Sequence, residues 1–166
     1  MKYSRIETIR FGIQIGFKDC LTNLNNLLIK DGCLESMPFF DEKNIVLDMD
    51  CVERKIAKTE KRSNNKSMDS LLLIKDSAGN TEIVFVEYRF NYKSMRNLKA
   101  GDLKNKKKYS ERHIKNKGFT NIHSKYYYIF DSGLKAQARR YFRNLYPLMP
   151  NNFKPISISD LKSTFF

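Results

Sequence analysis

The strongest constraint on the fold is a pair of apolar, β-prone segments separated by a short run of turn residues. The segments are residues 70–74, with the sequence SLLLI, and residues 83–88, with the sequence IVFVEY. Between them, residues 76–80 read DSAGN, and most of these residue types favour tight or left-handed backbone. This pattern predicts an antiparallel β-hairpin.

The position of the turn also predicts which residues face each other. In an antiparallel pair the numbers of facing residues add up to a constant, which is about 156 for a turn centred near residue 78. Asp69 then faces Glu87, and Arg89 points to the same side because side chains alternate along a strand. The residues on that face are Asp69, Leu71, Leu73, Phe85, Glu87 and Arg89. The opposite face carries Leu72, Ile74, Val84, Val86 and Tyr88.

Both faces of this hairpin are largely apolar, which predicts a sheet that is covered on both sides. We therefore expect an α/β fold with a central mixed sheet and helices on both faces, in a single domain over residues 1–166. Before the hairpin we expect a helix at residues 17–30 and a polar loop at 61–67. After it we expect a basic helix at 102–117, an aromatic strand at 125–130 and a short last strand at 154–158. A further helix is expected after Ser132. Residues 33–60 stay open, with a strand or a first helical turn at 44–49 and a short helix at 51–58.

Positive charge is the first indication of a partner. The chain carries a formal net charge of +13. Residues 1–50 hold six basic and eight acidic residues, so residues 51–166 hold 25 and 10, a net charge of +15. Such a surface favours nucleic acid, although a ribosomal partner, an anionic membrane or a merely lysine-rich composition are alternatives. The lysine cluster that would contact phosphates, or simply form a solvated helix face, is Lys104, Lys106, Lys107 and Lys108.

Several classes of protein do not fit this sequence. No apolar run approaches the roughly 20 residues of a membrane span, and the charged amino terminus does not resemble a signal peptide, so we expect a cytoplasmic protein without a membrane partner. The three cysteines, Cys20, Cys33 and Cys51, are expected to be reduced and buried. His113 and His123 lack the spacing of metal ligands.

The predicted pairing of Asp69 with Glu87 is where chemistry is expected. Two facing carboxylates repel each other and lose solvation, whereas a divalent cation between them would stabilise both. Mg²⁺, or Mn²⁺ in its place, prefers oxygen ligands and is often held by one or two carboxylates together with a substrate phosphate. In the alternative interpretation, Asp69 ends a strand and Glu87 pairs with Arg89 or a neighbouring lysine.

The order of Met68, Asp69, a hairpin, Glu87 and Arg89, followed by a basic helix and an aromatic strand, resembles the PD-(D/E)xK nuclease superfamily over residues 45–131. The resemblance implies a restriction-endonuclease-like αβββαβ core. It also implies that Asp69 and Glu87 bind the metal and that Arg89 replaces the motif lysine, which contacts the attacking water.

Two further residues enter through the same resemblance. Lys93 would take over if the motif lysine has migrated along the chain, and it would then also contact nucleic acid. Glu53 is a candidate for the glutamate that the first helix of this superfamily often adds, although its position favours a solvated helix residue.

The sequence thus gives two hypotheses for function. The first is a metal-dependent nuclease that hydrolyses phosphodiester bonds of DNA through Asp69, Glu87 and Arg89, or an inactive relative of such an enzyme. The second is a non-catalytic module of the same fold that binds nucleic acid or another protein. The oligomeric state is left open, with a homodimer among the alternatives.

Overall fold

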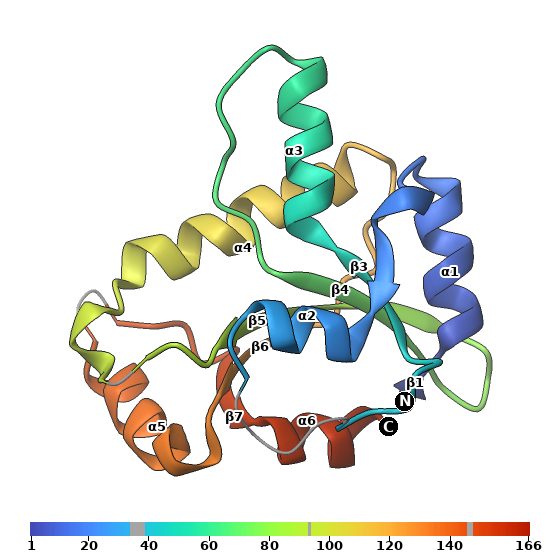
Figure 1. Cartoon of the computed structure of the whole chain (residues 1–166). Coiled ribbons are helices and arrows are strands. Elements are labelled where there is room, and N and C mark those ends of the chain that lie inside the picture. The colour runs from blue at the N-terminus through green and yellow to red at the C-terminus, as the bar shows by residue number, and fades with distance from the viewer. Residues whose placement is uncertain (34–38, 93, 146–147) are drawn as a thin grey trace.

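A seven-stranded mixed sheet organises the computed structural model, which describes residues 1–33, 39–92, 94–145 and 148–166 (Figure 1). From one edge to the other, the strands are β2 (Leu21–Asn23), β3 (Ile45–Asp48), β4 (Ser70–Lys75), β5 (Thr81–Arg89), β6 (Tyr126–Phe130) and β7 (Phe153–Ser157). The short β1 (Lys2–Tyr3) pairs with β4. Strands β2 to β5 are antiparallel to their neighbours, while β5, β6 and β7 are parallel. The predicted α/β class with a mixed sheet is confirmed.

The β4–β5 hairpin has the register that the turn predicted. Leu71 pairs with Phe85 and Ser70 with Val86, so the facing positions add up to 156 throughout the ladder. Asp76 closes the turn by accepting a hydrogen bond from the backbone N–H of Asn80 at 2.8 Å, and Gly79 adopts a φ of +91°, which a residue with a Cβ rarely adopts. Asp69, one step beyond the ladder, therefore lies level with Glu87.

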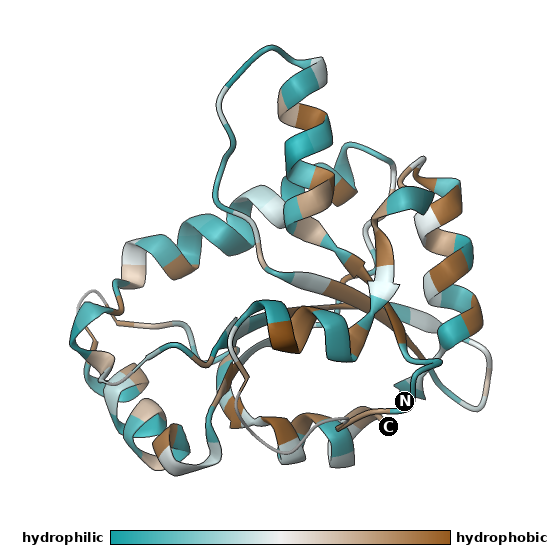
Figure 2. Ribbon diagram, in the orientation of Figure 1, coloured by the Kyte–Doolittle hydropathy of each residue, from teal (hydrophilic) through white to brown (hydrophobic). Residues whose placement is uncertain are grey.

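Helices cover both faces of the sheet, as expected. One face packs against α1 (Arg5–Gln14), α3 (Met49–Thr59), α4 (Ala100–Lys115) and α5 (Lys135–Asn144), and the other against α2 (Leu24–Lys30) and α6 (Ile158–Phe165). Hydrophobic residues line the sheet and the inner sides of these helices, while α3 and α4 are mainly hydrophilic on their outer sides (Figure 2). In the described part of the chain, no helix combines the length and the apolar character needed to cross a membrane.

Two other predicted elements lie where the sequence placed them. The basic helix is α4, in which Leu103 and Ile114 are buried as the predicted apolar stripe. The aromatic strand is β6, and all five of its side chains are buried. Its three tyrosines are therefore core residues.

The predicted helix over residues 17–30 is wrong in its first half. Lys18–Cys20 form a 3₁₀ turn and Leu21 pairs with Leu47 as part of strand β2, so α2 begins only at Leu24. Asn23 caps that helix, since its side-chain oxygen accepts from the backbone N–H of Asn25 at 2.8 Å. The stretch left open contains β3 and α3, and α6 follows the last strand without having been predicted.

The expectation of three reduced cysteines is also wrong. Cys20 and Cys51 form a disulfide, with their Cα atoms 5.5 Å apart. The partners are 31 residues apart in sequence and meet because α3 packs against the turn that precedes β2. This pairing depends on tertiary contacts, which the cysteine spacing does not reveal. Cys33 is buried, as expected.

Candidate functional site

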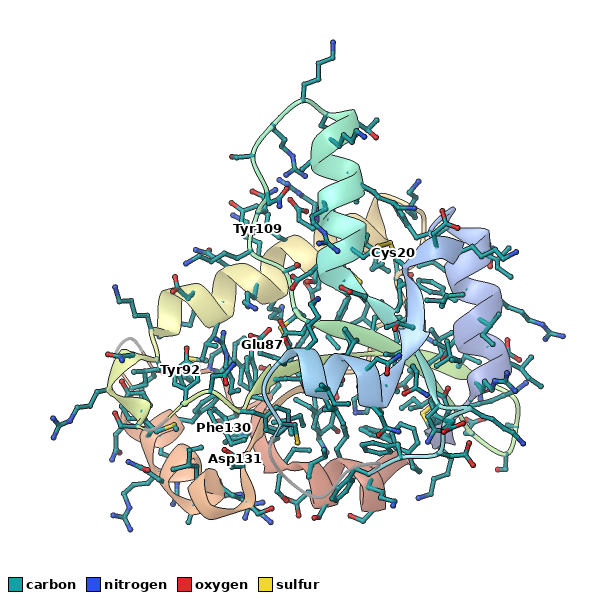
Figure 3. All side chains as sticks on the ribbon, viewed as in Figure 1. Cys20, Glu87, Tyr92, Tyr109, Phe130 and Asp131 are labelled. Atoms are coloured by element: carbon teal, nitrogen blue, oxygen red, sulfur yellow. A yellow bond between two sulfur atoms is a disulfide. The ribbon has the colours of Figure 1, made fainter. Side chains whose placement is uncertain are left out.

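Asp69 and Glu87 converge on a single cation, the side-chain ammonium of Lys106. Lys106 Nζ lies 3.1 Å from Asp69 Oδ1 and 2.7 Å from Glu87 Oε1. Both acids are buried, with exposed fractions of 8% and 0%. Figure 3 places Glu87 between α2 and α4, in the middle of the molecule. The two carboxylates are thus within reach of one ion, as the predicted register required.

The backbone around Asp69 holds its side chain in place. Asp69 Oδ2 accepts a hydrogen bond from the backbone N–H of Tyr88 at 2.6 Å, so the side chain continues the ladder where the backbone pairing of β4 ends. The carbonyl of Asp69 accepts from Met49 N at the start of α3. Asp69 is thereby attached to both the neighbouring strand and the helix above it.

Lys106 reaches the site because it lies on the inner side of α4. Leu103 and Ser110, three residues before it and four after it, share this side of the helix and are buried. Ser110 Oγ accepts from the backbone N–H of Met68, which joins α4 to the segment that leads into Asp69. Of the four clustered lysines, Lys106 is the one whose ammonium contacts these carboxylates.

Arg89 forms one side of the site and is held by several partners. One guanidinium nitrogen lies 2.7 Å from Glu87 Oε1, and another donates to the hydroxyl of Tyr92 at 3.0 Å. The guanidinium carbon also lies 5.3 Å from the centre of the Tyr92 ring. Arg89 therefore compensates negative charge on Glu87. It stays protonated, so it is a poor proton carrier.

Burial dominates the proton equilibria of the carboxylates. The pKa of Glu87 is raised to about 8, first by desolvation and then by the charge of Asp69, against the opposing effects of Lys106 and Arg89. Burial likewise raises the pKa of Asp69, although Lys106 and the Tyr88 N–H oppose this. Burial lowers the pKa of Lys106, but the two carboxylates outweigh it and the pKa is raised overall. Burial thus raises the pKa of both carboxyl groups, and Lys106 opposes this rise at each of them.

Sequence reasoning missed Asp31, which belongs to the same electrostatic environment. Asp31 follows the last residue of α2, and its Oδ2 is buried without a hydrogen-bond partner among the described residues. Burial raises its pKa to about 7, and the charges of Asp69 and Asp50 contribute in the same direction. Its place before Gly32 marked it only as the end of a helix, so no signal in the sequence distinguished it.

Asp69 and Glu87 suit a divalent cation, but they do not complete its coordination shell. Glu87 Oε2 is buried and makes no hydrogen bond within the described ranges, and Asp69 lies beside it. Across the described residues, however, no group of three or more His, Cys, Asp and Glu side chains is arranged to hold a metal ion. Two carboxylates suffice for Mg²⁺ only when water and substrate phosphate complete its coordination.

The chain matches no family model, no curated protein and no solved structure. Its chemistry therefore has to be inferred from the geometry of the residues themselves.

Glu53 is not the solvated helix residue that the sequence favoured. It is buried, and its carboxylate contacts His113 Nε2, Arg62 NH1 at 2.5 Å and the backbone N–H of Asn65 at 2.5 Å. Burial raises the pKa of Glu53, but these donors outweigh it and the pKa is lowered overall. Both oxygens already have partners, so the structure gives Glu53 the role of anchoring the loop before β4.

The other lysines predicted to contact phosphate have different environments. Lys93 lies outside the described residues. Lys107 forms an ion pair with Glu111 at 3.1 Å and lies 4.7 Å from the centre of the Tyr126 ring. Lys104 lies two residues before Lys106, and Lys108 lies two residues after it. Two residues correspond to a little more than half a turn of an α-helix, so both side chains point away from the Asp69 and Glu87 carboxylates.

Proposed function

We propose that the chain is a metal-dependent nuclease that hydrolyses phosphodiester bonds of DNA at the site formed by Asp69, Glu87 and Lys106. One observation carries the proposal. Both carboxylates lie within 3.1 Å of the same cation, although each is buried where an uncompensated charge would be unfavourable. Mg²⁺ or Mn²⁺ is the cofactor that this pair would hold, with Asp69 and Glu87 as its protein ligands.

The arrangement of elements supports the resemblance to PD-(D/E)xK nucleases. In chain order, α2, the antiparallel strands β3, β4 and β5, the helix α4 and the parallel strand β6 correspond to an αβββαβ core. Helix α3 is an addition between β3 and β4. The candidate residues Asp69, Glu87 and Lys106 lie at the junction of β4, β5 and α4.

The residues of the chain can be given distinct roles in this hydrolysis. A bound Mg²⁺ would activate water and offset negative charge on the phosphate. Lys106 presents up to three N–H donors, and two of them point to the carboxylates when no metal is bound. Where a metal takes the carboxylates, these donors are free for a phosphate oxygen. Arg89 stays charged and stabilises negative charge that develops near Glu87. Lys106 thus supplies the amine that the motif position lacks, and Arg89 acts as a fixed positive charge.

One observation favours the second hypothesis, a non-catalytic module. Lys106 already compensates both carboxylates, so the site is a closed ion cluster that is stable without a metal. In that case the acids would serve the fold alone, and nucleic acid or protein binding would take place elsewhere on the surface.

A cleavage assay with matched variants separates these hypotheses. Wild-type protein, Glu87→Gln and Asp69→Asn are incubated with single-stranded DNA, double-stranded DNA and RNA, in Mg²⁺, Mn²⁺ or a chelator. Glu42→Gln is the control, because it makes the same change on an exposed side chain. We expect cleavage in Mg²⁺ or Mn²⁺ by wild type and control, and a loss of at least about 100-fold in the two site variants. Equal cleavage by all four proteins, or none on any substrate, would overturn the nuclease.

Calorimetry of the metal alone gives an independent measurement. Mn²⁺ should bind to wild type and to Glu42→Gln, but not to Asp69→Asn or Glu87→Gln. Metal binding without cleavage would indicate an inactive relative, and no metal binding would favour the closed ion cluster.

A further inference from the structure

The outer side of α4 borders a second basic surface, separate from the Asp69 and Glu87 carboxylates. A hollow of about 400 Å³ lies between Lys104 and Lys108 of α4 and the turn that contains Pro150. A second hollow, also of about 400 Å³, lies between α5 and β7 and includes Arg143 and Lys154. Both hollows are lined by Pro150 and Phe153, so they adjoin, and we refer to them together as the α4–α5 groove.

The cations of this groove are available to a ligand. Lys104, Lys108, Arg143 and Lys154 form no ion pair with a carboxylate in the described part of the chain, whereas Lys106 and Lys107 are both paired. Among the described residues that line the groove, Glu111 is the one acid, and it is compensated by Lys107 and Lys115. The groove therefore carries a net positive charge that nothing within the described residues neutralises.

The layout of these charges suits a long polyanion better than a small anion. Lys104 and Lys108 are one helical turn apart, about 6 Å along α4. Arg143 and Lys154 continue the positive charge along the adjoining hollow, past the apolar side chain of Phe153. Figure 1 shows α4 and α5 on the same side of the molecule, and Pro150 and Asn152 line the hollow beside α4. Cations spread over two adjoining hollows that share the apolar residues Pro150 and Phe153 suit a chain of phosphates joined by sugars.

We propose that the α4–α5 groove binds the sugar-phosphate backbone of nucleic acid at a distance from the reacting phosphate. The inference rests on the proposed function, because it assigns a second contact of the same substrate. Lys106 and the α4–α5 groove lie on opposite sides of α4. The substrate therefore spans this helix, and a nucleic acid too short to do so loses the groove contacts.

The salt dependence of binding tests this assignment. Binding of fluorescently labelled duplex DNA is measured in chelator over a range of salt concentrations, so that no cleavage is needed. The groove variant combines Lys104→Gln, Lys108→Gln, Arg143→Gln and Lys154→Gln. The control variant removes the same charge elsewhere, through Arg5→Gln, Lys18→Gln, Lys43→Gln and Lys58→Gln, at exposed residues. Circular dichroism verifies that both variants are folded.

We expect the groove variant to bind DNA about 10 to 1,000-fold more weakly than the control near 0.1 M salt. The slope of log affinity against log salt should also fall by about 0.9 for each duplex contact removed. Equal affinity and slope in the two variants would overturn the groove, even if the protein cleaves DNA. If wild type binds polyglutamate as strongly as DNA and the groove variant does not, the α4–α5 groove would be assigned to an acidic protein instead. Weakened DNA binding by the groove variant, in a protein that cleaves nothing, would support the groove and reject the nuclease.

Discussion

Lys106 Nζ lies 2.7 Å from Glu87 Oε1 and 3.1 Å from Asp69 Oδ1, so one ammonium group compensates two buried carboxylates. This places a positive charge where the proposed divalent cation would be held by the same acids. The ammonium and the metal compete for the carboxylates, and the stability of the metal-free protein should depend on the ammonium.

Substituting Lys106 tests this competition. Lys106→Met removes the ammonium but keeps an unbranched side chain, and breaking a buried ion pair in this way costs about 3–5 kcal/mol. Mg²⁺ should restore much of that loss by binding between the carboxylates. Thermal unfolding with and without Mg²⁺ should thus show a larger increase in melting temperature for the variant than for wild type.

Lys104→Met is the matched control, since Lys104 lies on the outer side of the same helix. Its melting temperature should respond to Mg²⁺ as wild type does. A response to Mg²⁺ that is equal in Lys106→Met, Lys104→Met and wild type would contradict a metal site at these carboxylates.

The raised pKa of Glu87 predicts that the metal-free protein becomes less stable as the pH increases. Folding raises this pKa from 4.5 to about 8, so the fold favours the protonated form. The contribution is fully present below about pH 4.5 and is lost as the pH rises through about 8. Urea unfolding in chelator should show a free energy of unfolding that decreases between pH 5 and pH 9, and Glu87→Gln should reduce the decrease.

Asp31 contributes to the same pH dependence with the same sign, because its pKa is raised to about 7. Glu87→Gln should therefore leave a residual decrease that Asp31→Asn makes smaller, with the raised pKa of Asp69 accounting for part of the remainder. Identical pH profiles for wild type and Glu87→Gln would show that Glu87 does not titrate in this range.

How much of this site the sequence predicts depends on how local the contacts are. The turn at residues 76–80 sets the register of β4 and β5, and the register alone brings Asp69 level with Glu87. Lys106 could not be selected from its neighbours in the same way. Four lysines lie within residues 104–108 of one helix, and the packing of α4 against the sheet determines which of them points inward.

The incorrect prediction over residues 17–30 has a related cause. Leu21, Leu24 and Leu28 follow helical spacing, but Leu21 belongs to a strand that pairs with β3, a partner 26 residues further along. A short apolar stretch fits both the helical and the strand repeat, and long-range pairing determines whether a helix or a strand is formed. The disulfide was missed for the same reason, since Cys20 and Cys51 meet only after α3 has packed.

The buried contacts of Glu53 predict a structural effect that is separate from metal binding. Glu53→Gln removes the carboxylate that contacts both His113 and Arg62, while Arg62 keeps its ion pair with Glu60, and the change should destabilise the protein by about 1–3 kcal/mol. The affinity for Mn²⁺ should be unchanged, because all the contacts of Glu53 lie within the protein. Urea unfolding and calorimetry measure the two effects. Loss of Mn²⁺ binding in a folded Glu53→Gln protein would instead make Glu53 a metal ligand.

The Cys20–Cys51 disulfide predicts a sensitivity to reductant that the third cysteine does not share. Closing a loop of 31 residues restricts the unfolded chain and stabilises the fold by about 3–4 kcal/mol in the loop-entropy description. Dithiothreitol should lower the free energy of unfolding of wild type by this amount, and that of Cys33→Ala by a similar amount. The double variant Cys20→Ala with Cys51→Ala should already be less stable and should not respond to reductant. If wild type is equally stable with and without dithiothreitol, the disulfide does not contribute to folding stability.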